Sequence, residues 1–358
     1  KSDPEGVRQT LNHYTVVLAA TCQQSASKAV TNITNTPESS FESVIVDEAA
    51  RANPLDLFIP LSLAQRRIVL VGDHRQLPHI LEPEVEKQLR NSSTTTQESL
   101  QNSLFERLFI YLKNLEQKDG IKRTVTLDTQ YRMHPVLGDF VSKNFYEIHG
   151  EPHIESQRPE KEFYHDLPDY QPAVATWINV PFHLGKEQQG KSKSRAIEAQ
   201  IITQEIKRLI EINPELTFGI ITFYAAQVKE IWKALARNDL AQISEEGQYE
   251  IVPQWRETRD QEGKIVERLR VGTVDAFQGK EFDVVFLSLV RSNNISVNQE
   301  ADLRKKYGFL MLENRLCVAM SRQKRLLIAV GDLGMIQEEK TSEVIPHLVQ
   351  FYQLCCSK

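Results

Sequence analysis

Short runs of consecutive apolar residues, many of them β-branched, alternate along the chain with longer segments in which apolar residues return every three or four positions. Strands that are apolar at every position are typical of parallel sheets buried on both faces. The clearest runs cover residues 15–20, 43–46, 67–71, 217–222, 284–289 and 326–330, and weaker ones cover 124–127, 176–180 and 270–274. Helical periodicity is clearest at 196–212, 225–236 and 310–321. The alternation predicts an α/β fold with parallel, doubly wound sheets.

Polar segments between these elements indicate how the chain is organised. A polar stretch near residues 115–123 predicts a boundary between a domain of residues 1–118 and a domain of residues 119–358. The second domain contains a charged insertion at about 238–268, for which we expect a surface loop or a small hairpin. The segment 82–101 ends in a Ser/Thr/Gln-rich stretch, which predicts a mobile loop.

Composition excludes several classes of protein. The chain has 358 residues, a net charge of -5 and 25% charged residues, so it carries no uniformly basic coat, although a local cationic groove remains possible. No uncharged apolar run approaches the ~20 residues that span a bilayer, which excludes a membrane protein. Four cysteines, two of them adjacent, form no disulfide framework, so we expect a reducing intracellular compartment. The chain begins with Lys1 and no signal peptide, so we expect it to be part of a longer protein.

Polar side chains follow two of the predicted strands at the point where each strand ends. Asp47 and Glu48 come directly after the run at 43–46, and Gln76 follows the run at 67–71. Ligands of open α/β sheets lie outside the carboxyl ends of strands, where one carboxylate can hold Mg²⁺ and another can orient a water molecule. A glutamine there can hydrogen-bond a phosphate or the attacking water. The alternative is a pair of ordinary solvated turns.

Arginines stand out in two later segments. Arg132 lies in the sequence LDTQYRMHP, where its guanidinium could form a bidentate fork to phosphate and the neighbouring Tyr131 could stack on a base. Arg315 and Arg322 are seven residues apart in a predicted helix and are therefore expected on one face. The alternative is that these arginines lie on the protein surface, in solvent or in ion pairs, which is more common for arginines on one helix face.

Five motifs in one order resemble a known family. DEAA, GDHRQLP, QYRMHP, VDAFQGKEFDVV and NRLCVAMSRQ lie in this order between residues 15 and 332. The set resembles superfamily 1 helicases, in the branch that contains the nonsense-decay RNA helicase and Senataxin. The resemblance implies two RecA-like domains with parallel sheets, the first truncated at its N-terminal side. It also implies an ATP-dependent translocase that moves in the 5′→3′ direction on single-stranded DNA or RNA. The implied cofactors are ATP and Mg²⁺, and no membrane partner is implied.

The resemblance also assigns roles to individual residues. It places Asp47 on Mg²⁺ and makes Glu48 the carboxylate that activates water. The remaining nucleotide-site residues are a γ-phosphate sensor, two arginine fingers reaching the γ-phosphate, an adenine neighbour, a motif V glycine and a motif V acid facing the ribose: Gln76, Arg132, Arg322, Tyr131, Gly279 and Glu281. The positions implied on the nucleic-acid side are Thr21, Thr273, Arg291, Ser292 and Asn293.

The sequence also departs from the family's pattern. Arg51 stands where the family usually has glutamine, and Phe223 replaces a proline. No GxxxxGK[ST] motif occurs, and Lys186, Lys191 and Lys280 follow glycines without completing one. Since a P-loop cradles the phosphates, we expect little ATPase activity from this chain alone and a P-loop in the upstream part of the same polypeptide.

Two other functions remain open at this point. The missing P-loop favours a non-catalytic nucleic-acid-binding or scaffold module derived from a helicase, although such a module would not need the acids and arginines. A nuclease fused to a helicase is a further alternative, but four nearby histidines are the only hint of a site, and histidines on polar turns are usually surface residues. These histidines are His134, His149, His153 and His165.

Overall fold

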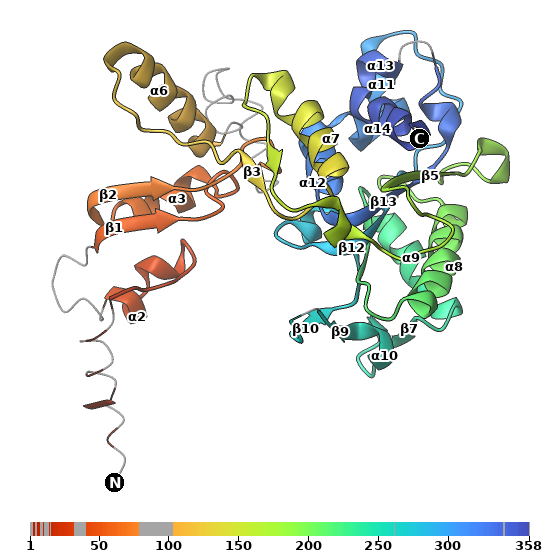
Figure 1. The fold of residues 1–358 in the computed structure, drawn as a ribbon, viewed down its shortest axis with the longest axis horizontal. Coiled ribbons are helices and arrows are strands. Elements are labelled where there is room, and N and C mark those ends of the chain that lie inside the picture. The colour runs from red at the N-terminus through yellow and green to blue at the C-terminus, as the bar shows by residue number, and fades with distance from the viewer. Residues whose placement is uncertain are drawn as a thin grey trace. The chain divides into compact units, whose positions relative to one another are not determined.

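The computed structural model describes residues 16–31, 41–78, 103–260, 262–338 and 341–357, together with a few isolated residues before position 16. It divides the chain into two compact units, Lys1–Val125 and Thr126–Lys358 (Figure 1). The division lies a few residues beyond the predicted boundary after residue 118. The loop predicted at 82–101 lies outside the described residues.

The first unit contains a two-stranded parallel sheet. Strands β1 (Phe41–Val46) and β2 (Ala64–Leu70) pair in parallel and are connected through α3 (Pro54–Leu61), which Asn53 caps by accepting a hydrogen bond from the Leu55 amide. Around this sheet the unit has η1 (Gln24–Ala26), α2 (Lys28–Thr31) and α6 (Leu104–Asp119). The strands predicted at 43–46 and 67–71 are therefore present.

The sheet of the first unit leaves much of its apolar surface uncovered. The side chain of Ile45 is 70% exposed and that of Ile68 is 51% exposed. The strand predicted at 15–20 is wrong: residues 16–20 form no strand, and Val16 and Val17 are exposed. An apolar run becomes a strand only where a neighbouring strand pairs with its backbone, and the described residues supply none for this run.

The second unit is built on a five-stranded parallel sheet. Its strand order is β11-β6-β12-β13-β5. All four pairings are parallel, and Thr222 of β6 lies opposite both Thr273 of β11 and Ser288 of β12. The strands are β5 (Ala175–Asn179), β6 (Phe218–Thr222), β11 (Leu269–Thr273), β12 (Phe282–Ser288) and β13 (Gln323–Gly331). The predicted α/β fold with parallel sheets is confirmed.

Helices cover both faces of this sheet. On one face α8 (Ala196–Ile212) and α9 (Ala225–Arg237) share a buried core with alternate strand residues such as Phe286 and Ile328. On the other face Trp177 of β5 meets Tyr352 of α14 (Pro346–Cys356) edge-on. Helix α14 contacts α7 (Pro135–Phe145), which in turn contacts α12 (Glu313–Ala319). The remaining helices of this unit are α10 (Pro253–Arg256), α11 (Glu300–Tyr307) and α13 (Thr341–Val344).

Short strands lie outside the main sheet. The insertion predicted at 238–268 forms two antiparallel hairpins on either side of α10. They are β7 (Ala241–Ile243) with β8 (Tyr249–Ile251), and β9 (Glu257–Arg259) with β10 (Ile265–Glu267). The weak strand expected at 124–127 is absent; the nearest strand is β3 (Thr129–Gln130), which pairs in parallel with β4 (Glu155–Ser156). None of the helices in the described ranges has the length and apolar character needed to span a bilayer.

Candidate functional site

Two polar turns lie side by side in the first unit, where β1 and β2 end. The amide of Ala49 donates to the carbonyl of Val71 at 2.8 Å, and the amide of Val71 donates to the carbonyl of Val46 at 2.9 Å. Asp47 and Glu48 follow β1 directly and are exposed to solvent. The parallel pairing therefore brings the sequence DEAA next to the sequence GDHRQ, as expected for the carboxyl ends of neighbouring strands.

The backbone of the first turn is unusual at Glu48. Its φ is 53°, in the left-handed region that costs a non-glycine residue roughly 1–2 kcal/mol. The Glu48 amide donates to Asp47 Oδ1 at 2.9 Å, which holds the two acids in one turn. On the second turn Gly72 is required, because a Cβ there would lie 2.8 Å from the Ala50 amide nitrogen. The two turns thus approach as closely as their backbones allow.

Gln76 has a defined orientation in the second turn. Its Nε2 donates to Asp73 Oδ2 at 2.7 Å, and Asp73 Oδ1 accepts from the Arg75 amide at 2.9 Å. Asp73 therefore fixes the side-chain amide of Gln76 within the second turn. The roles of Asp47, Glu48 and Gln76 stay predictions.

A second cluster forms in the second unit from three distant segments. Arg132 Nε contacts Glu281 Oε2 at 2.9 Å, and its Nη1 donates to the carbonyl of Ser321 at 2.9 Å. Lys324 Nζ lies 3.2 Å from Glu281 Oε1. Arg322 is buried and donates from Nη2 to Ser321 Oγ at 2.8 Å. The two predicted arginine fingers and Glu281 are thus brought together at the amino ends of β12 and β13.

The structure corrects one expectation about these arginines. Arg315 and Arg322 do not share a helix face, because α12 ends at Ala319 and Arg322 lies beyond it. Its Nε donates to the carbonyl of Val318 at 3.1 Å, across the end of the helix. Arg315 instead pairs with Asp275 at 2.9 Å. The helix predicted at 310–321 is accordingly shorter and follows the 3-10 turn η6 (Gly308–Met311).

Two neighbours of this cluster lie at its exposed side. Tyr131 is 61% exposed, and its carbonyl accepts a hydrogen bond from Arg158. Gly279 has a φ of 74° in the exposed turn before β12, and a Cβ there would meet nothing within 4 Å. The backbone conformation, not crowding, therefore favours glycine at this position. The adenine role of Tyr131 and the place of Gly279 in the nucleotide site stay predictions.

Replacing Glu281 with glutamine is expected to destabilise the second unit at neutral pH by at most ~1 kcal/mol. Burial disfavours its charged form, but the hydrogen bond from Arg132 and the charge of Lys324 outweigh burial and hold its pKa below the ordinary value. The extra free energy of unfolding that Glu281 gives the wild type is thus present at neutral pH. It disappears as the pH falls from about 4.3, the pKa of glutamate in the unfolded chain, through the lower pKa of Glu281 in the folded protein.

Urea denaturation followed by tryptophan fluorescence measures this effect. All three tryptophans, Trp177, Trp232 and Trp255, lie in the second unit and report its unfolding. Glu211→Gln, an exposed change on α8, serves as the control. A difference between wild type and the Glu281→Gln variant that grows as the pH is lowered would contradict the prediction.

The predicted nucleic-acid positions of the second unit lie near the carboxyl edge of the sheet. Thr273 ends β11 and is half-buried. Arg291 and Ser292 are buried in the turn after β12, and Ser292 Oγ donates to Asp332 Oδ2 at 2.5 Å. Asn293 donates from Nδ2 to the carbonyl of Lys306 at 3.0 Å. These polar side chains first hold the turn together, and their contact with nucleic acid stays a prediction.

Thr21, the predicted nucleic-acid position of the first unit, is exposed. Its Oγ1 accepts a hydrogen bond from the Gln24 amide at 3.3 Å, at the start of η1.

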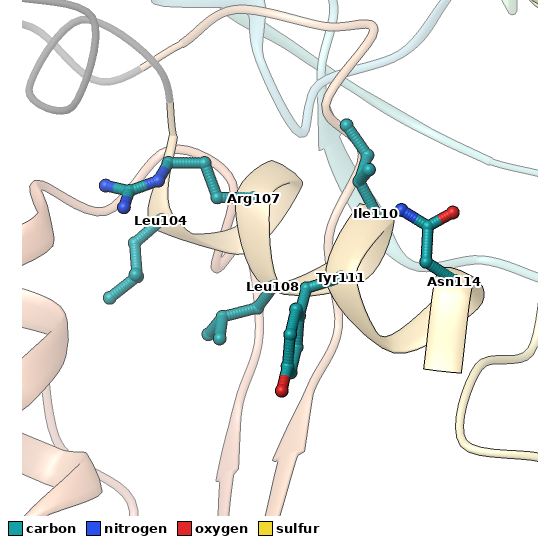
Figure 2. A pocket seen from close by; sticks show the side chains of 6 residues that line it. All are labelled: Leu104, Arg107, Leu108, Ile110, Tyr111 and Asn114. Carbon is teal, nitrogen blue, oxygen red and sulfur yellow. The ribbon is translucent and has the colours of Figure 1, made fainter. Parts of the chain in front are cut away.

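The first unit also contains an apolar hollow along α6. Figure 2 shows Leu104, Leu108 and Tyr111 pointing from the same face of this helix. The hollow contains none of the predicted site residues.

Sequence reasoning missed two buried acids near the turn after β12, Glu187 and Glu198. Both side chains are almost fully buried. Glu198 could have been found, because it lies four residues before the buried Ile202 on the apolar face of a predicted helix. Glu187 carries no such signal.

Among the described residues no group of three or more His, Cys, Asp or Glu side chains could hold a metal ion, so the four histidines form no such site.

Comparisons with known proteins match two successive segments of the chain. A family model described as an AAA domain matches residues 100–334, and a second model of that description matches residues 2–81. The ATP-dependent helicase upf1 of Schizosaccharomyces pombe is 31% identical over 299 residues, which cover 82% of this chain and 27% of that protein. The chain belongs to the superfamily 1 helicases of the Upf1/Senataxin branch.

Other relatives of this helicase chain show the same pattern. The regulator of nonsense transcripts 1 homolog of Drosophila melanogaster is 28% identical over 319 residues, covering 87% of the chain and 22% of that protein. Helicase sen1 of Schizosaccharomyces pombe is 28% identical over 306 residues, covering 84% and 15%. The helicase chain therefore spans well under half the length of these relatives. Among solved structures, the arterivirus helicase nonstructural protein 10 matches 84% of this chain and 40% of its own chain. The TM-score is 0.34 and the sequence identity 14%, so the similarity is slight.

Each unit, taken by itself, contains side chains of a kind that contact a magnesium–nucleotide complex. Mg²⁺ in nucleotide sites usually takes one or two carboxylates and completes its shell with water and phosphate oxygens, so no cluster of three acids is needed. Asp47 and Glu48 supply exposed carboxylates at the carboxyl end of β1. In the second unit, Arg132 and Lys324 are cations of the kind that contact phosphate oxygens.

Proposed function

We propose that this chain forms part of an ATP-dependent nucleic-acid helicase or translocase. The observation that carries the proposal is the convergence of Arg132, Glu281 and Arg322, which lie far apart in sequence, into one cluster. The paired turns holding Asp47 and Gln76 supply the acids and the amide that the same reaction needs. A relative's printed name, ATP-dependent helicase upf1, agrees with this activity.

Each group has a definite task in this proposal. Glu48 accepts the proton of the attacking water, and Gln76, held by Asp73, orients that water or the γ-phosphate. Arg132 and Arg322 neutralise the charge that develops on the transferred phosphoryl group. When bound beside Asp47, Mg²⁺ supplies charge neutralisation of the phosphate oxygens. Tyr131 lies near the adenine and Glu281 near the ribose.

We propose that the P-loop comes from an upstream part of the same polypeptide. The sequence has no GxxxxGK[ST] motif. In support, β1 and β2 are apolar parallel strands whose side chains, Ile45 and Ile68 among them, lie exposed. Parallel sheets are usually covered on both faces, so this sheet is suited to receive further strands and helices.

The proposed track is single-stranded DNA or RNA, with movement in the 5′→3′ direction as in the family. Thr21, Thr273, Arg291, Ser292 and Asn293 are the proposed contacts or supports of contacts on this track. The choice between DNA and RNA depends on contacts to the 2′-hydroxyl. We also propose that the protein works inside the cell, which suits its four free thiols.

ATP hydrolysis by the polypeptide that joins this chain to its upstream segment tests the proposal. We expect turnover that rises when single-stranded DNA or RNA is added, and little or no turnover from the 358-residue chain alone, because a P-loop is needed to hold the phosphates. Nucleic-acid binding by the longer polypeptide without any turnover would overturn the motor and favour the scaffold alternative. Turnover by the 358-residue chain that Glu48→Gln abolishes would overturn the need for the upstream P-loop.

A further inference from the structure

A loop of the second unit, residues 183–194, crosses the carboxyl edge of the sheet. We call this loop the basic strap, because it contains Lys186, Lys191 and Lys193 but only one acid, Glu187. The amide of Glu187 donates to the carbonyl of Ser292 at 3.2 Å, in the turn after β12. The Ser192 hydroxyl accepts from the Ala226 amide at 3.0 Å, in the first turn of α9. The strap therefore connects the segments that follow β12 and β6.

The strap is fastened to the turn after β12 by the buried carboxylate of Glu187. Its Oε2 accepts hydrogen bonds from the Ser292 amide and from Asn293 Nδ2, both at 3.1 Å, and lies 3.0 Å from Arg291 Nε. Its Oε1 lies 3.8 Å from Lys193 Nζ. One carboxylate thus gathers three consecutive residues of this turn and a lysine of the strap.

A second buried acid holds the two ends of the same assembly. Glu198 Oε1 accepts from Arg195 at 3.1 Å, and Arg195 also donates to the carbonyl of Gly185 at 2.6 Å. Glu198 Oε2 accepts from the Val290 amide at 2.9 Å. Val290 is a β-branched residue with a φ of 69°, a conformation that persists only where its surroundings enforce it. The strap and the strained turn are therefore fixed as one element.

Two cations of the strap point into solvent instead of into this network. Lys186 and Lys191 are exposed, and neither forms an ion pair within the described ranges. Many other lysines of the second unit do form ion pairs: Lys143, Lys193, Lys207, Lys233, Lys305, Lys306 and Lys324. In a chain of net charge -5, two uncompensated cations on an anchored loop favour a partner that supplies negative charge.

We propose that the basic strap binds the phosphate backbone of single-stranded nucleic acid, with Lys186 and Lys191 contacting phosphates and Glu187 positioning the strap. The inference rests on the proposed function, because it names a further contact on the same track. The carboxyl edge also carries the half-buried hydroxyl of Thr273, whereas the neighbouring Thr222 and Ser288 are fully buried and Ser288 Oγ donates to Glu198. An accessible hydroxyl and two lysine cations at the same end of the sheet are groups that contact the sugar–phosphate backbone of nucleic acids.

The salt dependence of binding tests the two lysines. Fluorescence anisotropy with a labelled single-stranded oligonucleotide gives the affinity of the 358-residue chain over a salt series. Each phosphate contact on a single strand contributes about 0.7 to the slope of log affinity against log salt. The K186Q/K191Q variant is therefore expected to lower that slope by about 1.4 and to bind roughly 20-fold more weakly at about 0.1 M salt.

A matched control changes the same charge at another place. Lys161 and Lys264 are exposed, and Lys264 lies in the turn of the β9–β10 hairpin, outside the five-stranded sheet. The K161Q/K264Q variant is expected to keep the wild-type slope, and the K186R/K191R variant is expected to retain binding. If K186Q/K191Q keeps the wild-type slope, the strap is not a contact although the proposed function stands. If the wild-type chain binds neither DNA nor RNA, the proposed nucleic-acid track itself fails.

A double-mutant comparison tests the positioning role of Glu187. In the E187Q variant the negative charge is lost and one oxygen becomes an NH₂ group. In either orientation of the amide this group faces donors, on Ser292, Asn293 and Arg291 or on Lys193, so the strap is held less firmly. We expect weaker binding and a lower salt slope than in wild type, but no further change of slope when E187Q is added to K186Q/K191Q. An equal change in both backgrounds would show that Glu187 acts only on the stability of the unit, which tryptophan fluorescence reports separately.

Discussion

Replacing Glu48 with glutamine is expected to lower the rate of ATP hydrolysis by about 10²–10⁴-fold, the usual contribution of a positioned general base. Glutamine keeps the size of the side chain but cannot accept the proton of the attacking water. The residue is exposed at the carboxyl end of β1, and its backbone is held in a left-handed conformation beside Asp47. A side chain held in a strained turn at a strand end is suited to chemistry on a ligand.

The measurement is single-turnover ATP hydrolysis by the polypeptide that joins this chain to its upstream segment, together with the affinity for ATP. The affinity is expected to change little, because Glu48 acts on the water. Glu42→Gln provides a matched control, since Glu42 is an exposed acid on β1 that pairs with Arg66 at 3.3 Å. A rate within about threefold of wild type for Glu48→Gln would show that another group takes the proton.

The strands and helices of the second unit could be predicted because each is defined by its own pattern. The helix predicted at 196–212 is found with the same bounds, and the apolar runs at 217–222 and 284–289 lie within or close to β6 and β12. Strands buried on both faces must be apolar at every position, so their pattern is unmistakable. The apolar run at 15–20 failed because strand formation also needs a partner strand, which a local pattern does not reveal.

The polar residues of the candidate site were harder to interpret. The motif order identified Arg132, Glu281 and Arg322, and the structure brings them together. Sequence could not show that Arg291 and Ser292 are buried, because the same polar residue can bind a ligand or form hydrogen bonds inside the protein. Their acidic partners, Glu187 and Asp332, come from distant positions that no local spacing connects to them.

The geometry around Arg132 explains why it is the better of the two arginines for a functional test. Arg322 is only 2% exposed and donates to the carbonyl of Val318 and to Ser321 Oγ, so its loss would leave buried acceptors unpaired and weaken the fold itself. Arg132 is partly exposed, and its contacts with Glu281 and the Ser321 carbonyl hold the guanidinium in place before any ligand arrives. Such a group stabilises developing charge without first being reorganised.

Arg132→Ala is accordingly expected to lower ATP turnover by about 10³–10⁵-fold, the range found for arginine fingers. Arg132→Lys should recover only part of the loss, because an ammonium group cannot make the two parallel hydrogen bonds of a guanidinium. Arg158→Ala is the matched control: Arg158 is a nearby partly exposed arginine that pairs with Glu162 and donates to the Tyr131 carbonyl. Steady-state ATP hydrolysis by the longer polypeptide measures all three variants. Equal losses of turnover for Arg132→Ala and Arg158→Ala would mean that positive charge near the amino ends of β12 and β13 sets the rate, and not an arginine finger at Arg132.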